Sequence, residues 1–89
     1  MKAIVTVLGK DTVGIIAAVC ALLSQHNVNV LDISQTILQD YFTMVMMVDI
    51  GECNSSFAEL AAALEAAGAE RNLSIRIQRE DIFNAMHRI

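Results

Sequence analysis

The chain has 89 residues, of which 55% are hydrophobic, and its 6 basic and 10 acidic side chains give a formal net charge of −4. This length predicts a single domain over residues 1–89, near the lower limit at which one hydrophobic core stabilises a chain without disulfides or bound metals. An acidic chain without a basic stripe argues against nucleic acid as a partner, and no apolar run approaches the roughly 20 residues of a membrane span. We therefore expect a cytoplasmic protein that binds neither nucleic acid nor membrane.

The first part of the chain predicts a strand followed by a helix. Residues 2–8 are rich in β-branched side chains and apolar on both faces, which favours a central strand. Residues 14–26 then place apolar side chains at helical spacing, and Asp11 or Thr12 is expected to cap the start of this helix. Cys20 falls among its apolar residues and is expected to be a small buried hydrophobe.

A hairpin and a second helix–strand pair complete the pattern. Residues 28–38 and 42–50 predict two strands, with a tight turn at residues 39–40. Asn54 or Ser55 is expected to cap an alanine-rich helix, and Gly68 to end it. The remaining predicted elements are this helix over 56–69, a strand over 72–79 and a short amphipathic helix over 81–88.

The order strand–helix–strand–strand–helix–strand predicts an α+β fold of the ferredoxin-like βαββαβ type with a terminal helix. Right-handed crossovers place the first and third strands in the centre of the sheet and the second and fourth at its edges. The two helices then cover one face. The other face carries Val45 and Met47 and is too apolar for water, so a second subunit or the terminal helix is expected to cover it.

This architecture hosts several functions, and the residues exclude some of them. The loop after the first strand, residues 9–14, lacks the arginine of an acylphosphatase and the paired thiols of a copper carrier. The central strands lack the stacking aromatics of an RNA-recognition domain. Cys20 and Cys53 have no metal-ligand spacing and fit a reducing compartment.

Catalysis finds little support either. His26 and His87 each end a predicted helix, where an imidazole is favoured by the helix dipole. Asp11 has no nucleophile or metal partner near it in sequence. Near the last strand three arginines, Arg71, Arg76 and Arg79, are expected to pair with the neighbouring carboxylates Glu70, Glu80 and Asp81. We therefore expect a non-enzyme with no catalytic residues, no metal site and no cofactor.

The segment from Leu8 to Ile37 carries the most specific signal. It begins Leu-Gly-Lys-Asp-Thr-Val-Gly-Ile-Ile, and after an apolar helix pattern it ends His-Asn-Val-Asn-Val-Leu-Asp-Ile-Ser-Gln-Thr-Ile. This pattern resembles the ACT domain, an amino-acid-sensing module, and is most similar to the ACT domains of the glycine cleavage system transcriptional repressor and to single-domain ACT proteins. The resemblance spans about residues 3–78, with Val13 standing where the commonest form has proline.

The resemblance implies a ligand site between the loop and the second strand, often that of a partner subunit. Carried over to this chain, the ligand-binding residues are Asp11, Val13, Gly14 and Asn29, and with less support Lys10, Thr12 and Asp32. Helix N–H groups would receive an α-carboxylate, and Asp11 an α-ammonium group. The same residues also suit ordinary roles, since aspartate caps helices, glycine turns the chain and asparagine begins strands.

The sequence leaves two hypotheses open. In the first, the protein is a small regulatory homodimer, or a tetramer built from it, that binds an amino acid or related metabolite at the loop and the dimer interface. Leu31, Ile33 and Ile37 lie on the predicted edge strand and favour pairing with a second copy. In the second, the chain is a ligand-free dimerisation module that docks to a partner protein.

Overall fold

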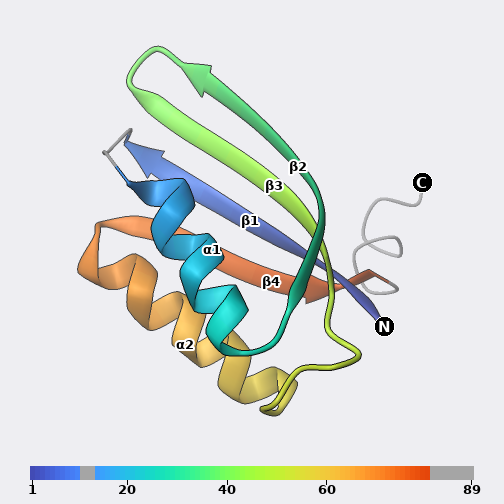
Figure 1. The fold of residues 1–89 in the computed structure, drawn as a ribbon. Helices are drawn as coiled ribbons and strands as arrows, with labels where there is room; N and C mark the ends of the chain where they lie inside the picture. Colours follow the sequence, from blue (N-terminus) through green and yellow to red (C-terminus); the bar gives the residue numbers. More distant parts are fainter. Residues whose placement is uncertain (11–13, 81–89) are drawn as a thin grey trace, which may run out of the picture.

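The computed structural model describes residues 1–10 and 14–80, so the predicted helix over 81–88 lies outside the described residues. Within them the chain forms four strands and two helices, in the predicted order (Figure 1). In chain order these are β1 (Lys2–Lys10), α1 (Ile15–Gln25), β2 (Asn29–Leu38), β3 (Tyr41–Asp49), α2 (Phe57–Glu70) and β4 (Leu73–Arg79).

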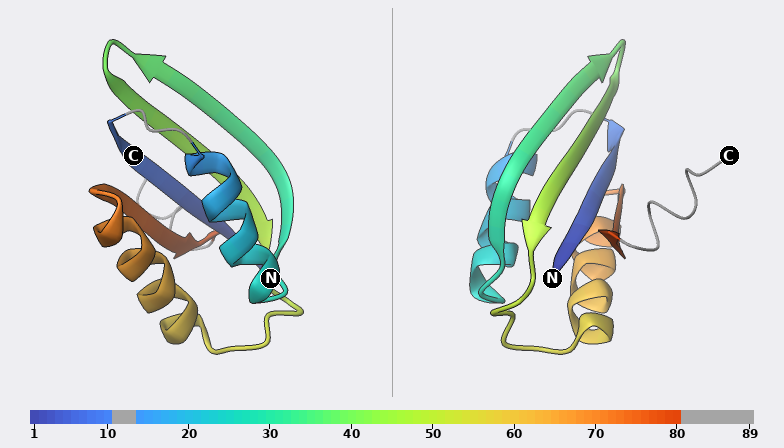
Figure 2. Two further views of the ribbon diagram at one scale, coloured as in Figure 1. Left: turned by 60° about the vertical axis from the view of Figure 1, so that its left-hand side comes forward. Right: turned by 90° about the vertical axis from the view of Figure 1, so that its right-hand side faces the viewer.

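The four strands form one antiparallel sheet in the order β2-β3-β1-β4. Both helices lie on one face of this sheet, as the two views of Figure 2 show. β1 and β3 are central and β2 and β4 are the edges, which confirms the predicted ferredoxin-like topology. None of the helices in residues 1–10 and 14–80 has the length and apolar character needed to cross a membrane.

The core lies between the helices and the sheet. Each helix contributes an apolar stripe at the predicted spacing, and the inward-facing residues of the central strands meet these stripes. Cys20 is half-buried at the margin of this core, because its place on α1 lies beside the stripe and not within it. The fully buried large side chains are Val5, Val7, Leu23, Met44, Met46, Val48, Leu60 and Leu64.

β1 continues two residues beyond its predicted end and includes Gly9 and Lys10. Gly9 pairs with Phe42 on one side and Leu73 on the other, so this glycine belongs to the sheet and not to the loop. A Cβ at Gly9 would collide with the Leu73 side chain and lie 3.3 Å from the carbonyl oxygen of Asn72. The missing side chain therefore allows the start of β4 to approach β1 closely.

The helix ends differ from the predicted ones. Gly14 occupies the N-cap position of α1 with φ 85°, a left-handed conformation that glycine adopts without strain. Ser56 is the N-cap of α2, where its hydroxyl accepts from the N–H of Glu59 and the Glu59 carboxylate accepts from the N–H of Ser56. This reciprocal capping box satisfies two N–H groups, an arrangement that Asn54 or Ser55 would not provide.

Gly68 does not end α2 but lies inside it, buried against β4. A Cβ there would be 2.7 Å from the carbonyl oxygen of Leu73, so glycine is needed for close packing of helix on strand. The helix ends at Glu70 with Arg71 as its C-cap, and Asn72 takes the left-handed conformation, φ 58°, that turns the chain into β4. The turn after β2 is confirmed, with Gln39 at φ 55° between paired Leu38 and Tyr41.

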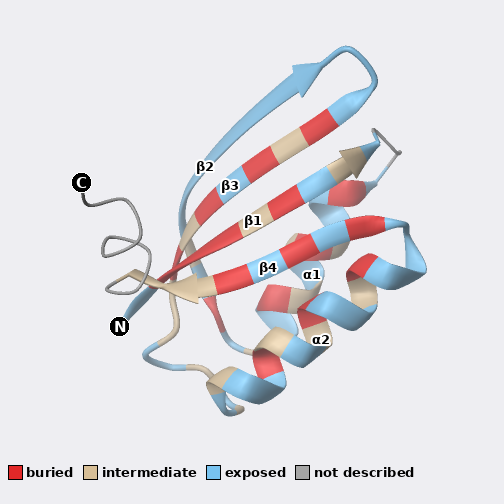
Figure 3. Cartoon of the chain, turned by 180° about the vertical axis from the view of Figure 1, so that it is seen from behind, coloured by how far each residue is buried: buried red, intermediate tan, exposed pale blue. Residues whose placement is uncertain are grey.

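Two surfaces remain exposed. β2 is exposed along nearly its whole length, while β3 and β4 alternate between buried and more exposed residues (Figure 3). The face of the sheet without helices carries Leu8, Tyr41 and Val45, all exposed.

Candidate functional site

The predicted ligand loop begins beyond the end of β1 and leads to Gly14. Asp11, Thr12 and Val13 lie outside the described residues. The Gly14 carbonyl oxygen accepts from Ala18 at 2.9 Å, the first hydrogen bond of α1. No described side chain caps this helix end, since glycine has none to offer. The N–H groups of its first turn therefore have no acceptor among the described side chains. Free N–H groups at the start of a helix are the arrangement that accepts a carboxylate.

Asn29 lies at the opposite end of α1. It is the first residue of β2 and is exposed, whereas Gly14 precedes the helix. An α-helix of 11 residues is about 16 Å long, so this distance separates the two predicted contacts within one chain. A single copy therefore does not bring Gly14 and Asn29 together around one amino acid.

A carboxylate with two partners lies opposite Asn29 on β3. Asp49 is its cross-strand partner, and the Asp49 carboxylate accepts from the N–H of Gly51 at 2.9 Å. The N-terminal ammonium group of Met1 lies 3.5 Å from the same oxygen. The Gly51 hydrogen bond and then this ammonium charge hold the pKa of Asp49 below its ordinary value. The carboxylate is thus charged at neutral pH, and the Met1 ammonium group is the cation that lies beside it.

Asn29 also lines a small hollow of about 230 Å³, formed by the end of α1, the start of β2 and the loop after β3. Its described lining residues are Ser24, Asn27, Val28, Asn29 and Glu52. Binding pockets for small molecules measure roughly 300–1,000 Å³, so this hollow by itself is smaller than a typical site.

The exposed strand β2 has a defined irregularity. The register with β3 shifts between Val30 and Asp32, so Leu31 is an extra residue in a β-bulge. The Asp32 carboxylate accepts from the N–H of Ile33 at 2.9 Å. The Asp32 side chain is therefore used in a local hydrogen bond to the backbone of the next residue. The apolar side chains of Leu31, Ile33 and Ile37 on the same strand remain exposed.

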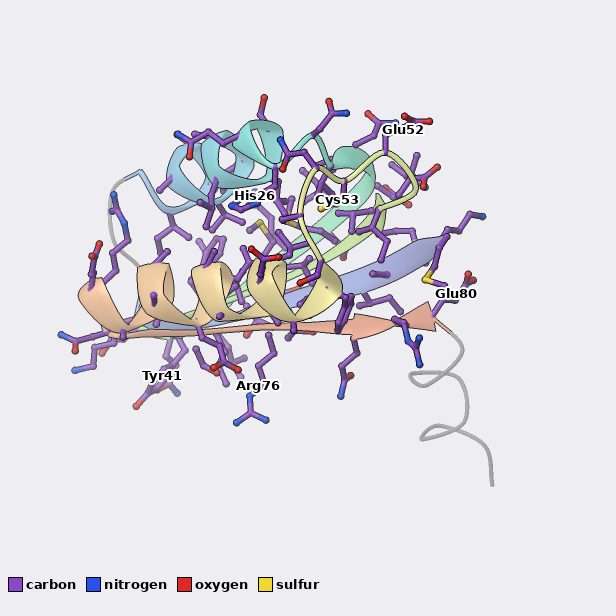
Figure 4. The ribbon with its side chains drawn as sticks, turned by 90° about the horizontal axis from the view of Figure 1, so that it is seen from below. His26, Tyr41, Glu52, Cys53, Arg76 and Glu80 are labelled. Carbon is purple, nitrogen blue, oxygen red and sulfur yellow. The ribbon has the colours of Figure 1, made fainter. Side chains whose placement is uncertain are left out.

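A polar cluster at the C-terminal end of α1 contains none of the predicted site residues. His26, the C-cap of α1, makes a 3.0 Å hydrogen bond through Nδ1 to the hydroxyl of Ser55, and the Cys53 sulfur lies 3.6 Å from that hydroxyl. Figure 4 shows His26 and Cys53 close together on the helical side of the sheet. The side chain of Asn54 donates to the carbonyl oxygen of Gln25 at 3.0 Å. These contacts fasten α1 to the loop before α2.

No sequence pattern pointed to this cluster, because His26 and Ser55 are 29 positions apart. Across residues 1–10 and 14–80, no three histidine, cysteine or acidic side chains are placed to hold a metal ion. The arrangement around Gly14 and Asn29 is thus one of backbone donors, amides and a carboxylate.

Comparisons with known proteins identify the family. The family model described as "ACT domain" matches residues 2–78 of the chain. A UPF0237 protein of Bifidobacterium longum is 58% identical over 88 residues, which cover 99% of this chain and 98% of that protein.

The chain belongs to the ACT domain family. Among solved structures, an ACT domain protein from Streptococcus pneumoniae is 43% identical, with a TM-score of 0.82 and 93% of each chain covered. A structure assigned to a glycine cleavage system transcriptional repressor has a TM-score of 0.74 at 22% identity, over 88% of this chain and 44% of that one. This second likeness shows the shared ACT fold, in agreement with the resemblance in sequence.

Proposed function

We propose that this ACT domain protein is a regulatory homodimer in which each ligand site is shared between two copies. The ligand is an amino acid or a related small metabolite. The observation that carries the proposal is the separation of Gly14 from Asn29 along α1, together with the exposed edge strand β2.

Strand direction supports this arrangement. β2 runs from Asn29 to Leu38, which lies at the same end of the sheet as the end of β1 where the ligand loop begins, with Tyr41 of β3 between them (Figure 1). If two copies pair their β2 strands antiparallel about a two-fold axis, the Asn29 end of one strand comes to the Leu38 end of the other. Asn29 of one copy then lies at the end of the second copy's sheet from which the ligand loop leaves, whereas within one chain it lies at the opposite end.

The chemistry on each side fits an amino acid. The first turn of α1, which no described side chain caps, offers N–H groups to an α-carboxylate, and Gly14 presents no side chain that would block the approach. The amide of Asn29 both donates and accepts hydrogen bonds, which suits the polar groups of an amino acid. In this proposal Asp11 pairs with the α-ammonium group and Val13 contacts the ligand from the loop, while catalysis has no part.

Dimerisation and ligand binding are then linked. The exposed apolar residues of β2 become covered when the strands pair, which favours the dimer. A ligand that binds only the shared site stabilises the dimer further by mass action. In this proposal the ligand therefore regulates how much of the protein is dimeric, and with it any surface that the dimer presents to a partner protein.

A thermal-shift screen against the twenty amino acids and common one-carbon metabolites tests the proposal, with the oligomeric state measured by light scattering. We expect one or two compounds to raise the melting temperature, and Asp11→Ala and Asn29→Ala to remove that rise. Ser74→Ala, an exposed change on β4, is the matched control and should retain it. A dimer without any shift at millimolar ligand would favour the ligand-free interaction module, and a monomer would refute the shared site.

A further inference from the structure

A second hollow, of about 500 Å³, lies at the end of the sheet where β1 ends, β3 begins and α2 turns into β4. Its described lining residues are Lys10, Tyr41, Arg71 and Asn72. It includes neither Gly14 nor Asn29, but it does include Lys10, which the resemblance assigned with less support to the ligand loop.

The fold brings these four residues together from three separate segments. Lys10 and Tyr41 are cross-strand partners in the last position of the β1–β3 pairing. On the other side of β1, Gly9 allows the turn that contains Asn72 to approach, because no Cβ stands between them. The N–H of Arg71 donates to the carbonyl oxygen of Gly68 at 3.0 Å, which holds the turn at the end of α2.

Charge distinguishes this hollow from the rest of an acidic protein. It gathers two cations, Lys10 and Arg71, and no carboxylate occurs among its described lining residues. The expected pairing of Arg71 and Arg76 with neighbouring carboxylates is wrong within the described part of the chain, where neither forms an ion pair. Lys10 likewise has no ion pair there, so both cations of the hollow are available to an anion.

The donors match a particular kind of anion. The guanidinium of Arg71 presents N–H groups in a planar fork that suits two oxygens of one group, and Lys10 adds a mobile point charge. The Tyr41 hydroxyl and the Asn72 amide provide further donors. Figure 4 shows Tyr41 directed away from the helices, on the open side of the sheet. Two positive charges and neutral donors balance a doubly charged oxyanion better than a singly charged one.

We propose that this hollow binds the phosphate group of a small phosphorylated metabolite. A phosphate monoester carries a charge between about −1.5 and −2 near neutral pH and has three strong acceptor oxygens. The volume of about 500 Å³ falls within the usual range of small-molecule sites and leaves room for an organic part beside the phosphate. The protein then has an anion site at the end of β1 in addition to the proposed amino-acid site.

NMR titration of ¹⁵N-labelled protein with glycerol phosphate, at ionic strength held constant with sodium chloride, tests the assignment. We expect saturable shifts at the amides of Lys10, Tyr41, Arg71 and Asn72. Arg71→Gln should weaken binding about tenfold or more, the effect of one lost charge-assisted hydrogen bond. Arg76→Gln is the matched control, since it changes the net charge of −4 by the same one unit but lies outside the hollow.

Three outcomes would overturn the proposal. Shifts that rise linearly without saturation would mean no site. An equal loss in Arg71→Gln and Arg76→Gln would mean general electrostatic attraction and not a built hollow. Binding of acetate as tight as that of glycerol phosphate would remove the preference for a double charge. Because neither the probe nor the variants touch Gly14 or Asn29, failure here leaves the proposed amino-acid site standing.

Discussion

Replacement of Gly14 by alanine is expected to destabilise the protein by about 1–2 kcal/mol, and backbone conformation is the whole cause. Gly14 has φ 85° and ψ 8°, a region that costs an L-residue roughly 1–2 kcal/mol. A Cβ added there would meet no atom within 4 Å, so no packing clash contributes. For a domain of this size each kcal/mol lowers the melting temperature by about 4–8 °C.

Urea unfolding followed by far-ultraviolet circular dichroism measures this loss. The protein concentration is held fixed, because association shifts apparent stability. Gly14→Asn should cost less than Gly14→Ala, since asparagine tolerates the left-handed region better. The chain is short enough for chemical synthesis with D-alanine at position 14, a residue that prefers positive φ and should add about 0.4–1 kcal/mol through the unfolded state. Equal stability of the L- and D-alanine proteins would refute the reasoning.

Three further predictions concern stability. Ser56→Ala should cost about 1 kcal/mol in urea unfolding, since the capping box with Glu59 is lost, whereas Ser74→Ala should cost little; equal losses would contradict the cap. Leu64→Ala should cost about 2–5 kcal/mol, because Leu64 is fully buried, and a loss below about 1 kcal/mol would mean that the core refills the space. The lowered pKa of Asp49 contributes stability above the ordinary aspartate pKa that is lost as the pH falls through the folded value. Asp49→Asn should therefore flatten the acid limb of the stability–pH curve, and an unchanged slope would contradict this.

Local pattern in the sequence was sufficient for the order of the elements and for their buried faces. The alternating apolar residues of β3 and the helical spacing in α1 and α2 specify what each element hides from water. The right-handed crossover rule then leaves one order of strands in the sheet, β2-β3-β1-β4, and this is the order in the structure. The loop motif also pointed to the ACT family. These features depend on residues that are neighbours in the chain, so the sequence records them directly.

The tertiary structure decided which distant segments meet. The sequence predicts Gly9 as a loop residue and Gly68 as a helix-end residue, yet both pack closely against β4. The sequence neighbours of a glycine do not reveal which backbone segment approaches it. The hydrogen bond between His26 and Ser55, and the hollow around Arg71, likewise join segments far apart in the chain. The sequence by itself thus determined the elements, their buried faces and the family. The predicted helix over 14–26 already separates Gly14 from Asn29, and the tertiary structure added that β2 is exposed along nearly its whole length, which is where the proposed site receives a second copy.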